Sequence, residues 1–344
     1  MKRLIRIPGM KIWSMLLLVS SMLGSCNILA EEEEDCDVYV RFKYDMNMEF
    51  TDAFSQAVNS VTLYAFDKQG VLAFQKTEEG ELLKQNGYRM HLDGISHNEK
   101  ADYDFITWAG EPDNESFSIP VLTVGKHTKE DLICQLNRAG DGVVDDDLES
   151  LFHGQLNGLT FGRAAQQPGV DVVVPLVKNT NSIRIVLQEV QGDPLNVNDF
   201  RFQVTDDNGT MNYDNTLLED EVLTYKAWFT DNGHAGMDEE VAQQEGITEI
   251  NVAIAELTTA RLMADQNPIL TITKADTGEQ VLKLPLVEAA LMYKRDKYKD
   301  MSDQEYLDRE DEYNFTFFLN NGKWTSASVY INSWKVIYRE LGLE

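Results

Sequence analysis

The stretch VYVRFKY at residues 38–44 decides the class of fold. Apolar side chains stand at every second position, and Arg41 and Lys43 alternate with them. A period of two indicates a strand with one face buried and one in water, because successive side chains on a strand point to opposite faces. We therefore expect the folded part of the chain to begin with a half-buried β-strand.

Similar short patterns fill residues 37–176. Residues 61–66 and 71–74 are expected to form a hairpin, because Asp67-Lys68-Gln69-Gly70 is a typical turn between them. A short helix is expected at 51–58, and another after Thr128, where Asp131 completes a capping pattern and Cys134 follows on the same helix. Further strands are expected at 88–92, 103–108, 117–122, 159–162 and 172–176.

The pattern then restarts in residues 177–344. The polar segment Lys178-Asn179-Thr180-Asn181 resembles a turn, and Asp206-Asp207-Asn208-Gly209 predicts a hairpin between strands at 201–204 and 210–213. Helices are expected from about 285 and after the capping pair Ser302 and Glu305. The other strands are expected at 183–187, 222–228, 250–257, 269–273, 280–284, 312–319 and 328–337.

These patterns predict an all-β chain with a few short helices, folded as two tandem β-sandwiches at 37–176 and 177–344. The length of 344 residues suits two domains. With 30 Lys and Arg against 58 Asp and Glu, the net charge is −28. This acidity argues against nucleic acid as a partner, because neutralising phosphates requires a basic surface.

The first 25 residues have the pattern of a signal peptide. They contain four bases and no acid, and an apolar run from Ile12 to Leu23 is too short to span a bilayer. The run ends in Leu23-Gly24-Ser25-Cys26, which resembles the bacterial lipobox. We expect cleavage between Ser25 and Cys26 and a covalent lipid on Cys26. The alternative is an ordinary cleaved signal that is followed by an incidental cysteine.

Residues 26–36 are expected to form an acidic tether. Glu31-Glu32-Glu33-Glu34-Asp35 is a block of like charges, which stays extended through self-repulsion. One interpretation is a solvated spacer. The other is a surface-export signal, because the block resembles the acidic cluster that follows the lipidated cysteine in Bacteroidetes lipoproteins exported to the outer face of the outer membrane.

No motif predicts a catalytic or metal site. His153 in Leu-Phe-His-Gly lacks a recognisable nucleophile and is expected to be structural, near the junction of the two sandwiches. The acids at 141–149 lack the calcium-loop pattern and are expected to be solvated. Cys36 and Cys134 either form a disulfide or remain separate thiols, and the sequence leaves both alternatives open. The tryptophans Trp108, Trp228, Trp324 and Trp334 form either core or a sugar-binding platform, and core is favoured.

Taken in order, these features resemble the fimbrial anchor lipoproteins of Bacteroidetes, the FimB-type subunits of type V pili. The matching features are the lipobox, the strand at 38–44 leading to Asp45-Met46-Asn47, Trp108-Ala109-Gly110, Leu151-Phe152-His153-Gly154, Lys178-Asn179-Thr180-Asn181 before Ile183-Arg184-Ile185, and Trp334 in the last strand. The resemblance implies two transthyretin-like sandwiches and no enzymatic activity. It also implies no cofactor besides the lipid on Cys26.

The resemblance further implies a protein held on the outer membrane by its lipid and exposed at the cell surface. There it would join fimbrial stalk or accessory subunits by β-strand complementation and limit fimbrial length. The strands at 38–44 and 328–337 are the two candidates for the exchange. An adhesin or glycan-binding lipoprotein is the alternative function, and a surface hydrolase, suggested only by the abundant carboxylates, is the third.

Overall fold

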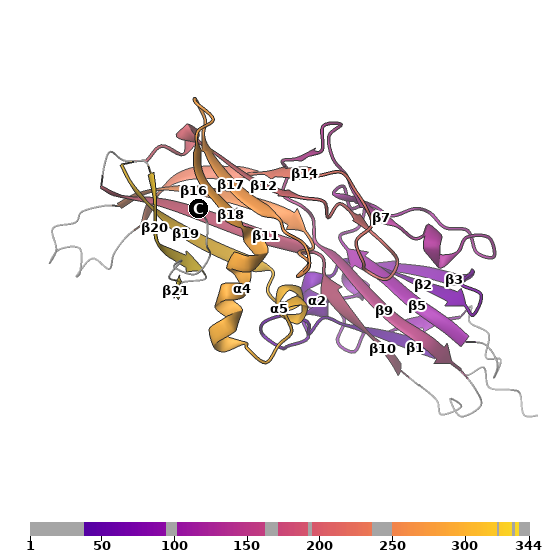
Figure 1. Ribbon diagram of the computed structural model, residues 1–344. Helices are drawn as coiled ribbons and strands as arrows, with labels where there is room; N and C mark the ends of the chain where they lie inside the picture. The colour runs from indigo at the N-terminus through magenta and orange to yellow at the C-terminus, as the bar shows by residue number, and fades with distance from the viewer. Residues whose placement is uncertain are drawn as a thin grey trace, which may run out of the picture.

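The computed structural model describes residues 38–93, 102–161, 171–191, 195–235, 250–321, 323–331 and 334–336. Within these ranges the chain is mostly β-strand with a few short helices, and the strands gather into two regions side by side (Figure 1). The prediction of an all-β fold of two tandem transthyretin-like sandwiches is confirmed.

The N-terminal sandwich is made from one sheet of seven strands. The opening stretch forms β1 (Val38–Lys43), in which Val38, Val40 and Phe42 are buried and Arg41 and Lys43 exposed, as the alternation predicts. The sheet order is β3 (Leu72–Glu79), β2 (Ser60–Asp67), β5 (Asp102–Gly110), β9 (Leu151–Thr160), β10 (Asp171–Lys178), β1 and β4 (Met90–Leu92). The predicted hairpin of β2 and β3 is confirmed.

This sheet curls over its own core. Val40 of β1 and Leu92 of β4 share one buried cluster with Leu63 of β2 and Phe105 of β5, so strands from both ends of the sheet face each other. The short helix α2 (Phe54–Ala57) adds Phe54, whose ring stacks on Phe42 with centroids 5.7 Å apart. The 3₁₀ turn η1 (Gly80–Leu82) follows β3.

Two sheets form the C-terminal sandwich. One has the order β15 (Phe229–Ala235), β16 (Ile250–Ala260), β11 (Thr180–Gln191), β19 (Glu312–Asn320), β20 (Lys323–Ile331) and β21 (Trp334–Val336). The other has the order β18 (Gln280–Pro285), β17 (Ile269–Lys274), β12 (Phe200–Asp206), β14 (Leu223–Lys226) and β8 (Val143–Val144). The helical elements are η4 (Val197–Asp199), α4 (Leu286–Lys297) and α5 (Asp303–Arg309), and Ser302 caps α5 as predicted.

A segment of the first half reaches across to the second half. A small sheet contains β6 (Phe117–Ser118), β7 (Cys134–Leu136) and β13 (Thr210–Met211). In it, β7 of the first half pairs with β13 of the second half, and elsewhere β8 of the first half pairs with β14 of the second. The main buried cluster also runs across, from Phe66 and Trp108 to Tyr225 and Leu284. The limits 37–176 and 177–344 stay a prediction, but strand pairs and core contacts join their two sides.

Two predictions in the crossing region are wrong. Cys134 lies on strand β7 and not on a helix, because only Lys129–Asp131 forms a helical turn (η2), inside the predicted Thr128 and Asp131 capping box. The segment 178–181 is not a turn, because only Asn179 separates β10 from β11. Its polar residues Asn179, Thr180 and Asn181 are buried, and the side-chain amides of Asn179 and Asn181 donate hydrogen bonds to Asn215 and to the carbonyl of Ala260.

The predicted hairpin at 206–209 is also wrong. β12 pairs with β14 and β17, and β13 pairs with β7 instead. Asn208 is fully buried, its amide donates to the carbonyl of Arg261, and it accepts from the hydroxyl of Tyr225. These side-chain hydrogen bonds hold the segment inside the protein, where a tight hairpin turn at the surface was expected.

Several strand limits also differ from the predictions. The strand expected at 328–337 is two strands, β20 and β21, which pair with each other. β9 begins at Leu151 and includes Leu-Phe-His-Gly, whereas a strand was expected only at 159–162. β6 ends at Ser118 and is much shorter than the expected strand at 117–122.

Candidate functional site

The predicted processing and export residues lie outside the described part of the chain. Ser25, Cys26, the acidic block at 31–35 and Cys36 all precede Val38, so lipidation, cleavage and export stay predictions. Cys134 is a free, fully buried thiol, and burial raises its pKa. Searched over the described residues, the helices include none with the length and apolar character needed to cross a membrane.

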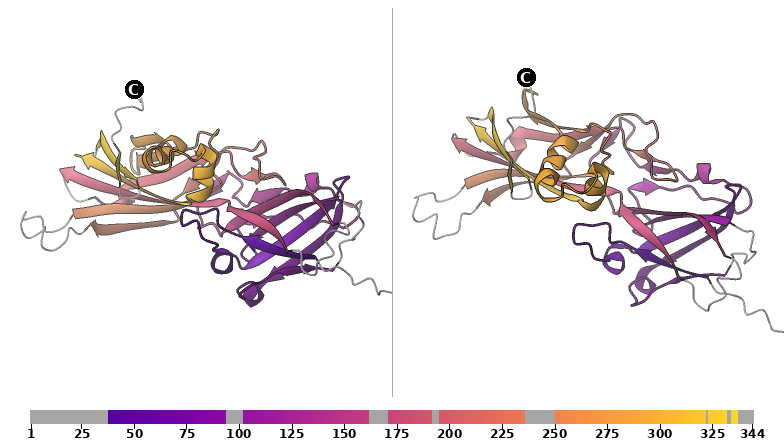
Figure 2. Two further views of the ribbon diagram at one scale, coloured as in Figure 1. Left: turned by 90° about the horizontal axis from the view of Figure 1, so that it is seen from below. Right: turned by 60° about the horizontal axis from the view of Figure 1, so that its bottom comes forward.

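The described chain begins at the pole of the N-terminal sandwich that faces away from the C-terminal sandwich. β1 runs parallel to β10, with Tyr39 opposite Asp171, and β10 leads after Asn179 into β11 of the second sandwich. The start of β1 therefore lies at the end of the N-terminal sandwich that is away from β11 and β19 (Figures 1 and 2). Cys26 precedes it by about a dozen residues, which span at most ~40 Å when extended.

The first candidate for strand exchange is an internal strand. β1 pairs with β10 on one side and with β4 on the other, over Val38–Val40. The outer strands β3 and β4 of the same sheet are bridged, because the ammonium group of Lys76 donates to the carbonyl of His91 at 2.9 Å. The hydroxyl of Tyr88 also donates to Glu78 of β3 at 2.7 Å. The edges of the N-terminal sandwich therefore contact each other.

The second candidate lies at an edge of the C-terminal sandwich. Among the described residues, β21 pairs only with β20, over Val329–Ile331. β18, which pairs with β17, is the corresponding outer strand of the facing sheet. At the opposite edge, the side chain of Asn232 in β15 accepts from the backbone of Val197, so η4 lies against that strand. On the side formed by β18 and β21, the helix α4 contacts both outer strands.

A buried polar network holds the junction between the sandwiches. The amides of Asn179 and Asn215 donate to each other at 2.6 and 3.2 Å. The Nε2 atom of His153 lies 2.8 Å from the carbonyl of Tyr213, and its ring packs edge-on against Trp108. His153 is buried near the junction as predicted, and burial lowers its pKa to about 4.

An ion pair and a hydrogen bond join the two sandwiches at two further places. Arg138 makes a two-pronged pair with Asp220 at 2.8 and 2.6 Å, and both side chains are largely buried. Gly209 lies against this pair, where an added Cβ would stand 2.7 Å from the carboxylate of Asp220. On the other flank Arg309 of α5 donates to the carbonyl of Asp45 at 2.9 Å. The contacts fix the relative position of the sandwiches.

The acidic loop at 141–149 is tied to its neighbours. Asp147 accepts from the hydroxyl of Thr258, and Glu149 from the backbone of Glu115. No cluster of three metal-ligating side chains occurs in the described ranges. Trp108 is core, as predicted, but Trp228 is 39% exposed, so its assignment to the core is wrong. The side chains of Trp324 and Trp334 lie outside the described part.

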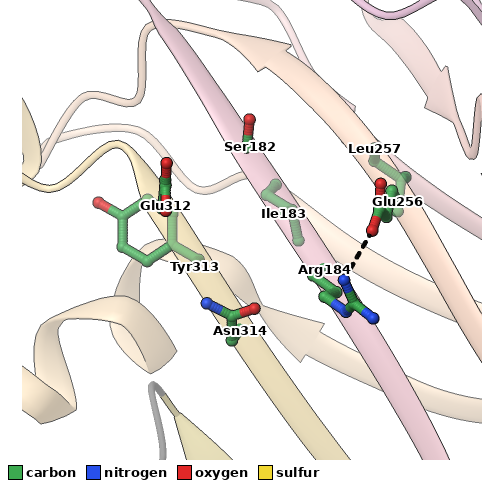
Figure 3. A pocket seen from close by; sticks show the side chains of 8 residues that line it. All are labelled: Ser182, Ile183, Arg184, Glu256, Leu257, Glu312, Tyr313 and Asn314. Carbon is green, nitrogen blue, oxygen red and sulfur yellow. Dashed lines mark hydrogen bonds and ion pairs between the residues drawn. The ribbon is translucent and has the colours of Figure 1, made fainter.

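One hollow opens on the outer face of the six-stranded sheet, at the ends of β16, β11 and β19 (Figure 3). Arg184 and Glu256 form an ion pair across it at 3.0 Å, with Ser182, Glu312 and Asn314 beside them. Ile183, Leu257 and Tyr313 also line it, but their side chains are buried in the core on the opposite face of the sheet. Sequence reasoning missed this hollow, because its residues come from three strands far apart in the sequence.

Two transthyretin-like sandwiches in tandem define the class of bacterial fimbrial subunits and adhesins, since solved structures of that class share this fold. A Bacteroides thetaiotaomicron structure described as a proposed adhesin is 32% identical, with a TM-score of 0.75 over 88% of this chain and 97% of that one. A proposed polysaccharide-binding protein of the same species is 30% identical, with a TM-score of 0.75 over 89% and 99% of the two chains.

The family is that of the fimbrillin-A associated anchor proteins Mfa1 and Mfa2, whose model matches residues 32–340, and the chain belongs to it. The minor fimbrium anchoring subunit Mfa2 of Porphyromonas gingivalis is 20% identical over 279 residues, which cover 78% of this chain and 76% of that one. The solved structure of that anchor protein has the same fold, with a TM-score of 0.63 over 88% of this chain. The resemblance predicted from the sequence is confirmed.

Proposed function

We propose that this chain is an outer-membrane lipoprotein that anchors a type V fimbrium at the cell surface. Membership of the anchor family over residues 32–340 carries the fimbrial role. The lipobox residues Leu23 to Cys26 supply the membrane attachment. Two or more acyl chains hold a protein stably on a membrane, so lipidated Cys26 would be a sufficient anchor.

The polarity of the molecule supports this arrangement. The tether joins the fold at Val38, and the strand pair β10 and β11 runs from that sandwich into the second one. The lipid would then hold the N-terminal pole at the membrane, and the C-terminal sandwich would project outward. The acidic block at 31–35 would direct export to the outer face, and changing its five acids to Asn and Gln should leave the protein inaccessible to added protease on intact cells.

Anchoring is tested by the variant Cys26→Ala. We expect the protein and its attached filaments to appear in the culture medium, measured by immunoblotting and electron microscopy of cells and supernatant. Intact fimbriae retained on cells that carry this variant would contradict the anchoring role. We further propose that the anchor limits fimbrial length, so cells lacking the chain should release longer filaments than the wild type.

For the stalk joint we propose β-strand complementation at the C-terminal sandwich. A sheet edge accepts an extended segment through main-chain hydrogen bonds, and among the described residues β18 and β21 each pair with a neighbouring strand on one side only. β1 suits this role less well, because β10 and β4 already flank it.

Proline variants in the two edge strands test the joint. Proline has no N–H to donate, so it weakens pairing at the edge that carries it. We expect either Lys335→Pro in β21 or Lys283→Pro in β18 to reduce binding of the purified stalk subunit at least tenfold, and the affected variant identifies the acceptor edge. Melting temperatures check that both variants fold. Wild-type affinity in both would contradict complementation at this side.

A further inference from the structure

Two aromatic side chains stand exposed where β14 leads into β15. Trp228 is 39% and Phe229 41% exposed, and their ring centroids lie 5.9 Å apart. The contrast with Trp108, which is 2% exposed, shows that this pair is not part of a core. Large exposed aromatic groups that lie together often mark a binding surface.

The aromatic pair continues into a row of polar side chains across the outer face of the six-stranded sheet. Phe229 lies opposite Glu256, Glu256 opposite Arg184, and Arg184 opposite Asn314. Directly opposed residues of paired strands share a face, with Cβ atoms about 5 Å apart in antiparallel pairs. The row crosses four strands and is ~14 Å long at the usual strand spacing. It passes through the hollow of Figure 3.

The stability of the fold does not account for this row. The side chain of Arg184 is 49% exposed, and an exposed ion pair such as the one with Glu256 contributes little to stability. Aromatic rings that stay partly exposed bury less apolar area than core residues do, so they stabilise the fold less. Three different chemistries thus lie in one row: flat apolar rings, a forked donor and a carboxylate acceptor.

These chemistries match a sugar chain. A pyranose ring has apolar C–H faces that stack on aromatic rings, and adjacent hydroxyl groups that both donate and accept hydrogen bonds. Arg184 supplies parallel N–H donors, Glu256 supplies acceptors, and Ser182 and Asn314 supply both. The hollow also contains Glu312, so its carboxylates outnumber its single guanidinium, which disfavours an anionic ligand.

We propose that the outer face formed by Trp228, Phe229, Glu256, Arg184 and Asn314 binds a neutral oligosaccharide. The rings stack on one sugar unit and the hollow holds the hydroxyl groups of the next. The site is separate from the lipid tether and from the edge formed by β18 and β21. Its function as a binding site therefore does not depend on the anchoring proposal.

The experiment uses the purified mature chain without other fimbrial subunits. An array of neutral hexose and pentose oligosaccharides, together with uronic-acid oligosaccharides, is screened first, and the neutral ligands found are titrated by calorimetry. We expect Trp228→Ala and Phe229→Ala each to weaken binding at least tenfold, and Arg184→Gln about as much. The matched control is Phe50→Ala, which removes a 54% exposed ring elsewhere and should leave the affinity unchanged.

Melting temperatures within about 3 °C of wild type would show that the variants are folded. Unchanged affinity in the Trp228, Phe229 and Arg184 variants would overturn the site. The absence of any neutral ligand at millimolar concentration, or binding confined to uronic-acid oligosaccharides, would overturn the ligand class. None of these results would alter the outcome of the Cys26→Ala experiment, which measures retention of filaments on cells.

Discussion

The two sandwiches close their sheets differently. In the N-terminal sandwich a single seven-stranded sheet curls until its outer strands β3 and β4 are bridged by Lys76 and the carbonyl of His91. In the C-terminal sandwich two separate sheets face each other, and β18 and β21 end them on one side. The curled sheet thus bridges its own edges, whereas the facing sheets end in β18 and β21 on one side, where α4 contacts both strands.

This difference matches the two proposed roles of the chain, attachment to the membrane and joining of the stalk subunit. The closed sandwich stands where the tether joins, and the sandwich with outer strands at its edge stands at the other end. The polar junction between them, with Asn179 buried and Arg138 paired to Asp220, resists relative movement. The comparison predicts that the junction contributes most to stability, the closed edge less, and the outer face of the six-stranded sheet least.

The largest effect is expected from Arg138→Ala. This change leaves the carboxylate of Asp220, 7% exposed, without its cationic partner, and breaking a buried ion pair costs about 3–5 kcal/mol. The free energy of unfolding, measured by urea titration, should fall by that amount. A loss below 1 kcal/mol would show that the pair does not hold the sandwiches together.

The pH dependence of the junction is the next largest effect. Burial lowers the pKa of His153 to about 4, from an ordinary value of 6.5. Between these values the unfolded chain binds a proton that the folded protein does not. Lowering the pH from 7 to 4 should therefore cost up to about 3 kcal/mol of stability through this group. His153→Gln should remove this loss, measured as unfolding free energy against pH.

Asp206 should act in the opposite sense. Burial raises its pKa to about 7, from 3.8, so between these values the folded protein holds a proton that the unfolded chain releases. Its contribution is fully present below pH 3.8 and is lost as the pH rises through 7. Asp206→Asn should remove this gain, so that the variant loses more stability on acidification than the wild type. Identical profiles of unfolding free energy against pH in the two proteins would contradict a raised pKa of Asp206 in the folded protein.

A smaller effect is expected at the closed edge. Lys76→Met removes the donor to His91 and the ion pair with Glu78, which should cost about 1 kcal/mol. Hydrogen exchange of the β4 amides should become faster, because β3 no longer holds that strand. Lys283→Met in β18, an exposed lysine of the C-terminal edge, is the matched control and should leave exchange unchanged.

The smallest effect is expected on the outer face of the six-stranded sheet. Arg184→Ala removes an ion pair whose arginine is 49% exposed, so urea titration should show a change below about 1 kcal/mol. A larger loss would mean that Arg184 stabilises the fold, and its effect on sugar binding would then need the more conservative Arg184→Lys variant.

Local patterns predicted single elements well. The alternation in residues 38–44 identified the buried face of β1, and the turn at 67–70 identified the hairpin of β2 and β3. Ser302 and Glu305 correctly marked the start of α5. The same logic failed at 206–209 and 178–181, because a polar sequence is compatible with a turn in water and equally with a buried hydrogen-bonded junction. The hollow at Arg184 gave no local signal at all.

By itself the sequence determined that the chain is built mostly of strands, which face of strands such as β1 is buried, and the family to which the chain belongs. It also contains the proposed lipid anchor at Cys26. Only the tertiary structure decided which strands pair, as in β7 with β13 and β11 with β19. The reason is physical: alternation along a strand fixes its faces, but partners distant in the sequence are chosen by packing and hydrogen bonding of the whole fold.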